Sequence, residues 1–133
     1  MEFNLVAIVA AIIVNMVLGA LWYSPVLFAK PWMKLSGVSM DKINKNSANA
    51  GYFISFLGSL IMAFVLSYFI SLTGMKSLSS GIQIGFWAGL AFIAATMVSD
   101  YMFAGRPMKL FYINLGYRWL GLILMGAVIG ILG

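Results

Sequence analysis

Two charged residues on apolar stretches offer the most distinctive chemistry in this sequence. Asp100 lies about three residues from the end of the third long apolar stretch, and Arg118 lies about ten residues into the fourth. At a rise of about 1.5 Å per residue, Arg118 is ~15 Å along its helix, and its side chain leans back towards the level of Asp100. We therefore expect these two residues to form an ion pair, or to share a polar cluster with Asn15 and Asn114.

The residue types that serve most enzymes and metal sites are absent from the chain. It has no cysteine, no histidine and three acidic residues. Disulfides and thiol chemistry are therefore excluded, and the commonest general base and metal ligand are missing. We expect no catalytic residue, no bound metal and no cofactor, and an enzyme is the least favoured class of function.

The composition is that of a protein whose solvent is the lipid bilayer. Of the 133 residues, 63% are hydrophobic and 8% are charged, whereas soluble domains have about 25% charged residues. Apolar stretches long enough to span a membrane as helices occur at about residues 5–23, 46–73, 81–103 and 108–132. We expect an all-α integral membrane protein, with four transmembrane helices in a single domain over residues 1–133.

Functional and structural interpretations of the charged pair both remain open. An arginine within a membrane costs about 2.5–3.5 kcal/mol on insertion scales, so Arg118 should face the bundle and have a partner. The pair then either belongs to an ion or solute pathway, or is a static contact that fixes helix register. Both side chains can also extend to the headgroup level, because Asp100 lies close to the end of its span.

The cations are distributed unevenly between the loops. A short amphipathic helix is expected at residues 25–35, lying in the membrane interface after the first span, with Pro31 bending or breaking it. The loop that contains this helix and the turn before the fourth span share one side of the membrane, and the other side has only Lys76. The positive-inside rule then places both termini outside the cytoplasm in the inner (plasma) membrane, and cations in such loops indicate topology rather than nucleic-acid binding. The cations on the shared side are Lys30, Lys34, Lys42, Lys45, Arg106 and Lys109.

Small residues recur at every fourth position in the second and third spans. Positions i and i+4 share one face of a helix, and a face of small residues lets another helix approach closely in lipid. A strict step of four drifts against a turn of 3.6 residues, so the stripe winds around its helix and should contact more than one neighbour. A chance excess of serine and glycine, which are common in membrane helices, is the alternative. The expected packing positions are Gly51, Ser55, Ser59, Ala63, Ser67, Gly81, Gly85 and Gly89.

Two further stretches contain aromatic, proline and basic residues in a specific order. Residues 19–25 read GALWYSP and are followed by Phe28, Lys30 and Trp32, and residues 106–117 read RPMKLFYINLGY. Together they resemble the two signatures of a family of small bacterial membrane proteins, domain of unknown function 1761 (DUF1761). The resemblance covers nearly the whole chain and implies a small four-span protein to which no activity is assigned. The positions that it singles out for mutation are Trp22, Tyr23, Pro25, Arg106, Asn114 and Tyr117.

Two functions fit these features. We expect a homo-oligomeric channel or transporter for an ion or small solute, because a second copy would supply another wall to so small a bundle. The alternative is a non-catalytic scaffold or accessory subunit that binds a membrane partner protein through its small-residue faces. The first predicts a water-reached cavity at the polar cluster, and the second predicts a dry polar pair with a small-residue groove facing lipid. The residues that would line or gate the pathway are Asn15, Asp100, Asn114 and Arg118.

Overall fold

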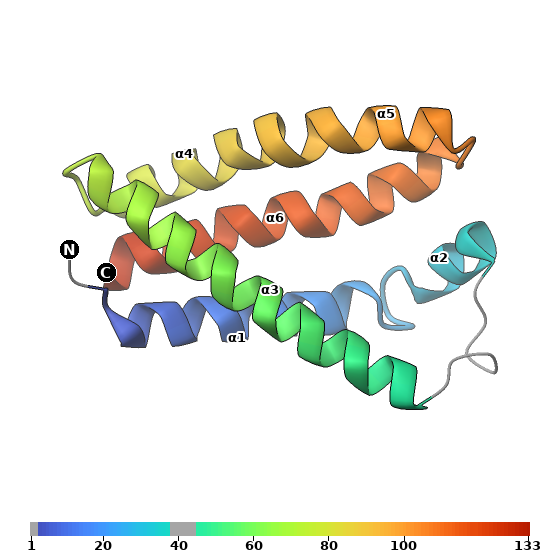
Figure 1. Cartoon of the computed structure of the whole chain (residues 1–133), viewed down its shortest axis with the longest axis horizontal. Helices are drawn as coiled ribbons and strands as arrows, with labels where there is room; N and C mark the ends of the chain where they lie inside the picture. Colours follow the sequence, from blue (N-terminus) through green and yellow to red (C-terminus); the bar gives the residue numbers. More distant parts are fainter. Residues whose placement is uncertain (1–2, 38–44) are drawn as a thin grey trace.

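The protein is a bundle of long antiparallel helices (Figure 1). In the computed structural model, residues 3–37 and 45–133 are described, with side chains described from residue 49 onward in the second range. The described part of the chain contains helices and turns and no strand. The elements in chain order are α1 (Leu5–Trp22), α2 (Ala29–Ser36), α3 (Lys45–Leu72), α4 (Leu78–Ala88), η2 (Gly89–Ala94), α5 (Ala95–Phe103) and α6 (Met108–Leu132).

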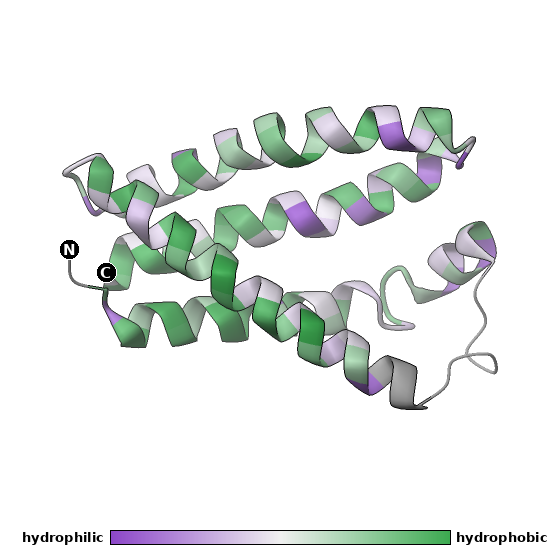
Figure 2. Ribbon diagram, viewed as in Figure 1, coloured by the Kyte–Doolittle hydropathy of each residue, from purple (hydrophilic) through white to green (hydrophobic). Residues whose placement is uncertain are grey.

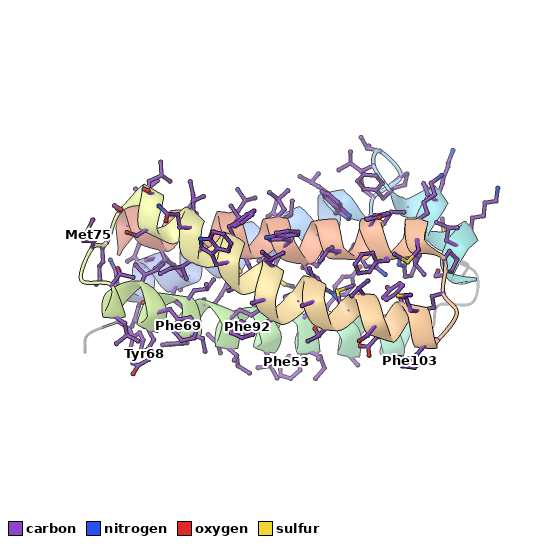
Figure 3. The ribbon with its side chains drawn as sticks, turned by 90° about the horizontal axis from the view of Figure 1, so that it is seen from above. Phe53, Tyr68, Phe69, Met75, Phe92 and Phe103 are labelled. Carbon is purple, nitrogen blue, oxygen red and sulfur yellow. The ribbon has the colours of Figure 1, made fainter. Side chains whose placement is uncertain are left out.

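Four helical segments in the described chain are long and apolar enough to cross a membrane. The third of them, Leu78–Phe103, is continuous through α4, η2 and α5. Figure 2 shows hydrophobic residues along most of each segment. Large apolar side chains such as Phe53, Phe92 and Phe103 project outward from the bundle (Figure 3), as expected of surfaces that face acyl chains. The prediction of an all-α protein with four membrane-spanning helices is confirmed.

The first and last spans meet at the end of the bundle that holds both termini (Figure 1). The Asn4 side chain accepts hydrogen bonds from the backbone N–H groups of Val6 and Ala7, which caps α1. Its amide nitrogen also donates to the carbonyl oxygen of Leu132 over 2.7 Å. One side chain therefore satisfies polar groups at the start of α1 and at the end of α6.

The closest helix contact joins α4 to α6 through glycines. A Cβ atom placed on Gly81 would lie 1.9 Å from the carbonyl oxygen of Gly126, and one on Gly126 would lie 2.2 Å from the carbonyl oxygen of Gly81. One turn later, a Cβ on Gly85 would lie 2.4 Å from the carbonyl oxygen of Leu122. The two backbones therefore touch, as small residues permit in a membrane. We term this contact the glycine seam.

Helix α3 crosses the bundle obliquely and leaves it towards its own N-terminus (Figure 1). Its small-residue stripe divides accordingly: Ser59, Ala63 and Ser67 are buried, whereas Gly51 and Ser55 are exposed. The oblique path of α3 explains this division, because every residue from 49 to 57 is exposed, whichever face of the helix it lies on.

The interfacial helix differs in detail from its prediction. Residues 24–28 form a turn, and α2 begins at Ala29, whose backbone N–H donates to the carbonyl oxygen of Ser24 over 3.1 Å. Pro31 is the third residue of α2. It does not break the helix, because the N–H groups of a first turn have no intrahelical partner to lose. Gly37 ends α2 in the left-handed conformation, at φ 78°.

The third span is interrupted by a π-helical turn, η2. The N–H of Ala95 reaches the carbonyl of Leu90, five residues back, and the Thr96 hydroxyl donates to the carbonyls of Phe92 and Ile93. A π turn adds one residue to the helix and so rotates the next helical segment by about 100°. Because of this extra residue, the positions of the third span that pack on α6 keep a step of four through the turn: Gly81, Gly85 and Gly89 are followed by Met97 and Tyr101.

Most described cations lie at one end of the bundle, which we term the basic end. This end comprises α2, the turn between α5 and α6 and the first turn of α6, and Lys76 lies in the turn at the opposite end. Lys42 lies outside the described residues, as does the side chain of Lys45. The cations of the basic end are Lys30, Lys34, Arg106 and Lys109.

Candidate functional site

Asn114 connects three parts of the chain at the basic end. Its side-chain oxygen accepts a hydrogen bond from the Tyr23 hydroxyl over 2.7 Å, and its amide nitrogen donates to the Tyr101 hydroxyl over 2.6 Å. Tyr23 directly follows α1, Tyr101 belongs to α5 and Asn114 to α6. One amide thus ties together the last residues of α1, the end of α5 and the first turns of α6.

Aromatic side chains pack around this amide. The indole N–H of Trp22 donates to the carbonyl oxygen of Ile113 over 2.8 Å. The Tyr23 ring makes edge-to-face contacts with Trp32 and Tyr117, with ring centroids 5.8 Å and 5.5 Å apart. These contacts bring residues 19–25 and 106–117 together, although they are far apart in the sequence. Pro25 is exposed in the turn after α1.

Asn15 forms a second, deeper polar contact. It is buried, and its amide nitrogen donates to the Ser59 hydroxyl over 2.8 Å. A Cβ on Gly121 would lie 2.5 Å from the Asn15 side-chain oxygen, so glycine lets this amide reach α6. One turn after Asn15, a Cβ on Gly19 would lie 3.0 Å from the Tyr117 hydroxyl, so this phenol packs against α1. Because Tyr117 packs on Tyr23, the two asparagines belong to adjoining networks.

Asp100 and Arg118 do not form the expected ion pair, and no salt bridge joins them among the described residues. The Arg118 guanidinium lies 3.4 Å from the sulfur of Met97, and both charged residues are exposed. Met97 is on the face of α5 that packs on α6, and a residue three positions later is rotated by about 60° from that face. Arg118 is nevertheless close enough to Tyr23 for its positive charge to lower the pKa of that phenol.

The Tyr23 phenol is neutral under ordinary conditions. It lies directly beyond the span that ends at Trp22. Burial raises the pKa of Tyr23 from 10.0 to about 12, and the nearby charge of Arg118 opposes part of this rise. Tyr23 is therefore a stable hydrogen-bond donor to Asn114.

We expect Tyr23 to ionise only near pH 12. Its pKa in the folded protein is above the value of 10.0 in the unfolded chain, so its contribution to stability is complete below pH 10 and is lost between pH 10 and about 12. An alkaline titration of tyrosinate absorbance, wild type minus Tyr23→Phe, measures this ionisation. A difference signal that titrates near pH 10 would contradict the burial of this phenol.

Cavities lie on both sides of the hydrogen bond between Tyr23 and Asn114. One, of about 280 Å³, is bounded by α2 and the start of α6 and is lined in part by Trp32, Arg106 and Asn114. The other, of about 240 Å³, lies between α1 and the diverging part of α3 and is lined in part by Tyr23 and Tyr117. A larger hollow of about 500 Å³ between α3 and α4 is open and almost wholly apolar. The two smaller cavities thus adjoin the hydrogen-bonded network, and the apolar hollow does not.

Comparison with known proteins identifies the family to which this chain belongs. A family model described as "Protein of unknown function (DUF1761)" matches residues 6–130. The chain belongs to the DUF1761 family. No curated protein and no solved structure matches the chain. Both motif stretches of this DUF1761 protein lie within the matched residues, so the resemblance inferred from them is confirmed.

Sequence reasoning missed the role of Tyr101 in this DUF1761 protein. Tyr101 was not among the expected site residues, yet it is buried and its hydroxyl accepts a hydrogen bond from the Asn114 amide. An antiparallel hairpin brings together residues on either side of its turn, so the tight turn after α5 was the available signal. The partner of Asn15 was detectable from a different signal, because Ser59 lies on the small-residue stripe of α3, which was expected to face neighbouring helices.

Proposed function

We propose that this protein is a non-enzymatic membrane protein that forms, as a homo-oligomer, a pathway for an ion or small solute. The observation that carries the proposal is the exposure of Arg118 on a membrane-spanning helix. An arginine facing acyl chains near the bilayer centre costs about 2.5–3.5 kcal/mol or more, so such a residue faces water or a protein partner.

The face of α6 that contains Arg118 is covered further along the helix and open at Arg118 itself. Leu122 and Met125, four and seven residues later, share this face and are buried in a cluster with side chains of α1 and α3. At the level of Arg118, α3 has diverged, and residues 49–57 of α3 are exposed. The charge therefore lies where the bundle is incomplete.

Polar groups continue from this opening into the bundle. The 240 Å³ cavity is lined in part by Ser55 of α3 and by the two tyrosines that pack near Arg118. Beyond them lies Asn15, seven residues before the end of α1 and therefore ~10 Å from it along the helix axis. These hydroxyl and amide groups thus form a row that runs from the basic end towards the bilayer centre.

A second copy of the chain is the partner that we propose for the diverging part of α3. A Cβ on Gly51 would meet no atom within 4 Å, and Ser55, one turn later, is also exposed. Such a small-residue face lets another helix approach closely in lipid. The positive-inside rule favours an orientation in which the basic end faces the cytoplasm and both termini lie on the outer side of the inner (plasma) membrane.

Flux measurements in vesicles test the proposal. Purified wild-type protein should pass at least one of chloride, potassium and protons, each followed with a dye sealed inside the vesicles. Arg118→Gln should change that flux about tenfold, since a lost interaction of about 1.4 kcal/mol is a factor of ten. Lys76→Gln, which removes a cation from the opposite end, is the matched control and should leave the flux unchanged. Equal flux in wild-type and protein-free vesicles for all three ions would rule the proposal out.

The exposed face with Gly51 and Ser55 also favours the second candidate, a scaffold that binds a membrane partner protein. This candidate predicts a monomer in detergent and no flux. Gly51→Leu distinguishes the two: it should dissociate the homo-oligomer if α3 contacts a second copy, and should not alter the mass of a protein that is already monomeric. Light scattering of the protein in detergent gives that mass.

A further inference from the structure

The cavity of about 280 Å³ at the basic end is set apart by the chemistry of its lining. It lies between α2 and the start of α6, and its walls include Trp32, Leu35, Arg106, Leu110 and Asn114. Its volume is close to the lower bound of about 300 Å³ that is usual for small-molecule sites. It is therefore large enough for a small polar group rather than for a whole cofactor.

The polar groups around this cavity are mainly hydrogen-bond donors. Arg106 contributes a guanidinium, which lies over the Tyr101 ring at 5.6 Å from its centroid. Trp22 and Trp119 donate their indole N–H groups to backbone carbonyls, whereas that of Trp32 donates to no other residue in the described chain. Asn114 uses one amide hydrogen on Tyr101 and has a second.

The start of α6 adds backbone donors to the same place. Its N-cap residue is Pro107, no side chain caps its first turn, and Pro107 and Leu110 both line the cavity. Unpaired N–H groups at the N-terminus of a long helix attract anions. These donors are independent of the side chains, so the site combines a cation, side-chain N–H groups and a helix terminus.

The surroundings are also positive. The nearby cations Lys30, Lys34 and Lys109 are exposed. Asp100, the one acidic residue whose position the structure describes, is exposed on α5 and is not part of the cavity wall. An anion in the cavity would therefore meet attraction from its surroundings.

We infer that this cavity binds a phosphate-bearing anion, presented by a phospholipid headgroup or by a soluble phosphate. Arginine binds phosphate oxygens bidentately, which suits Arg106 at the cavity mouth. The apolar walls at Leu35 and Leu110 suit the first carbons of a lipid's acyl chains. This site is separate from the opening at Arg118 and does not depend on the protein conducting anything.

Native mass spectrometry of the protein released from dodecyl maltoside tests the site. The probes are dioleoylphosphatidylglycerol, dioleoylglycerol (which has the same tails without phosphate) and inorganic phosphate. The phosphate-bearing lipid should bind wild-type protein about tenfold more tightly than dioleoylglycerol, as expected for hydrogen bonds to a charged group. Arg106→Gln should lose this preference, and Lys76→Gln, the matched control at the opposite end, should keep it.

A second variant and a displacement measurement complete the test. Trp32→Phe retains an aromatic ring against Tyr23 but removes the indole N–H, and should weaken lipid binding about threefold, which tests the site if Arg106→Gln fails to fold. Displacement of the lipid by inorganic phosphate would support a soluble phosphate as ligand, and its absence would support the headgroup. Equal lipid binding by Arg106→Gln and Lys76→Gln, or equal binding of the two lipids by wild type, would overturn the inference.

Discussion

Gly81→Ala should lower the free energy of unfolding by about 2 kcal/mol. The added methyl would lie 1.9 Å from the carbonyl oxygen of Gly126, a backbone atom that cannot move aside as a side chain can. Overpacking of this kind costs about 3 kcal/mol, and the better helix propensity of alanine returns about 1 kcal/mol. Unfolding in mixed micelles with increasing sodium dodecyl sulfate, followed by circular dichroism, measures the change.

Gly58→Ala is the matched control for the glycine seam. Gly58 is also inside a spanning helix, but a Cβ there would meet no atom within 4 Å. This variant should be unchanged or more stable by up to about 1 kcal/mol. Equal stability of Gly81→Ala and Gly58→Ala would show that α4 and α6 do not touch through their backbones.

Asn114→Leu should lower the free energy of unfolding by about 2–3 kcal/mol. Leucine has a similar size but removes two hydrogen bonds, and it leaves the hydroxyls of Tyr23 and Tyr101 without their partner. Leaving a buried polar group unpaired costs about 1–3 kcal/mol. The same micelle titration measures the loss.

The cost of Asn114→Leu should depend on the two phenols. In a Tyr23→Phe/Tyr101→Phe background, the same replacement should cost less than about 1 kcal/mol, because no hydroxyl is left unpaired. An unchanged cost in that background would mean that the amide stabilises the protein by packing alone.

The length and apolar character of the helices could be predicted from the sequence, because the bilayer imposes both. Four apolar stretches gave four spanning helices, with bounds that differ by a few residues. The regular glycines of the third span also marked a face, since Gly81 and Gly85 lie against the backbone of α6. In both cases the signal is local, and one physical requirement explains it.

The separation of Asp100 from Arg118 could not be predicted, because it depends on helix rotation. The π-helical turn at Gly89–Ala94 inserts one residue and rotates α5, and no proline or charged residue marks that turn in the sequence. The oblique path of α3 had no local signal either. Its small-residue stripe runs in both halves of the helix, yet only the half with Ser59 and Ala63 is buried.

The contrast between the glycine seam and the diverging part of α3 has a mechanical consequence. At the end with both termini, the backbones of α4 and α6 touch, so neither of these two helices can shift without separating them. At the basic end, residues 49–57 of α3 contact little of the bundle, so movement costs least there. Any movement of α3 should therefore be greatest in residues 49–57, whereas the part from Ser59 onward stays packed in the bundle.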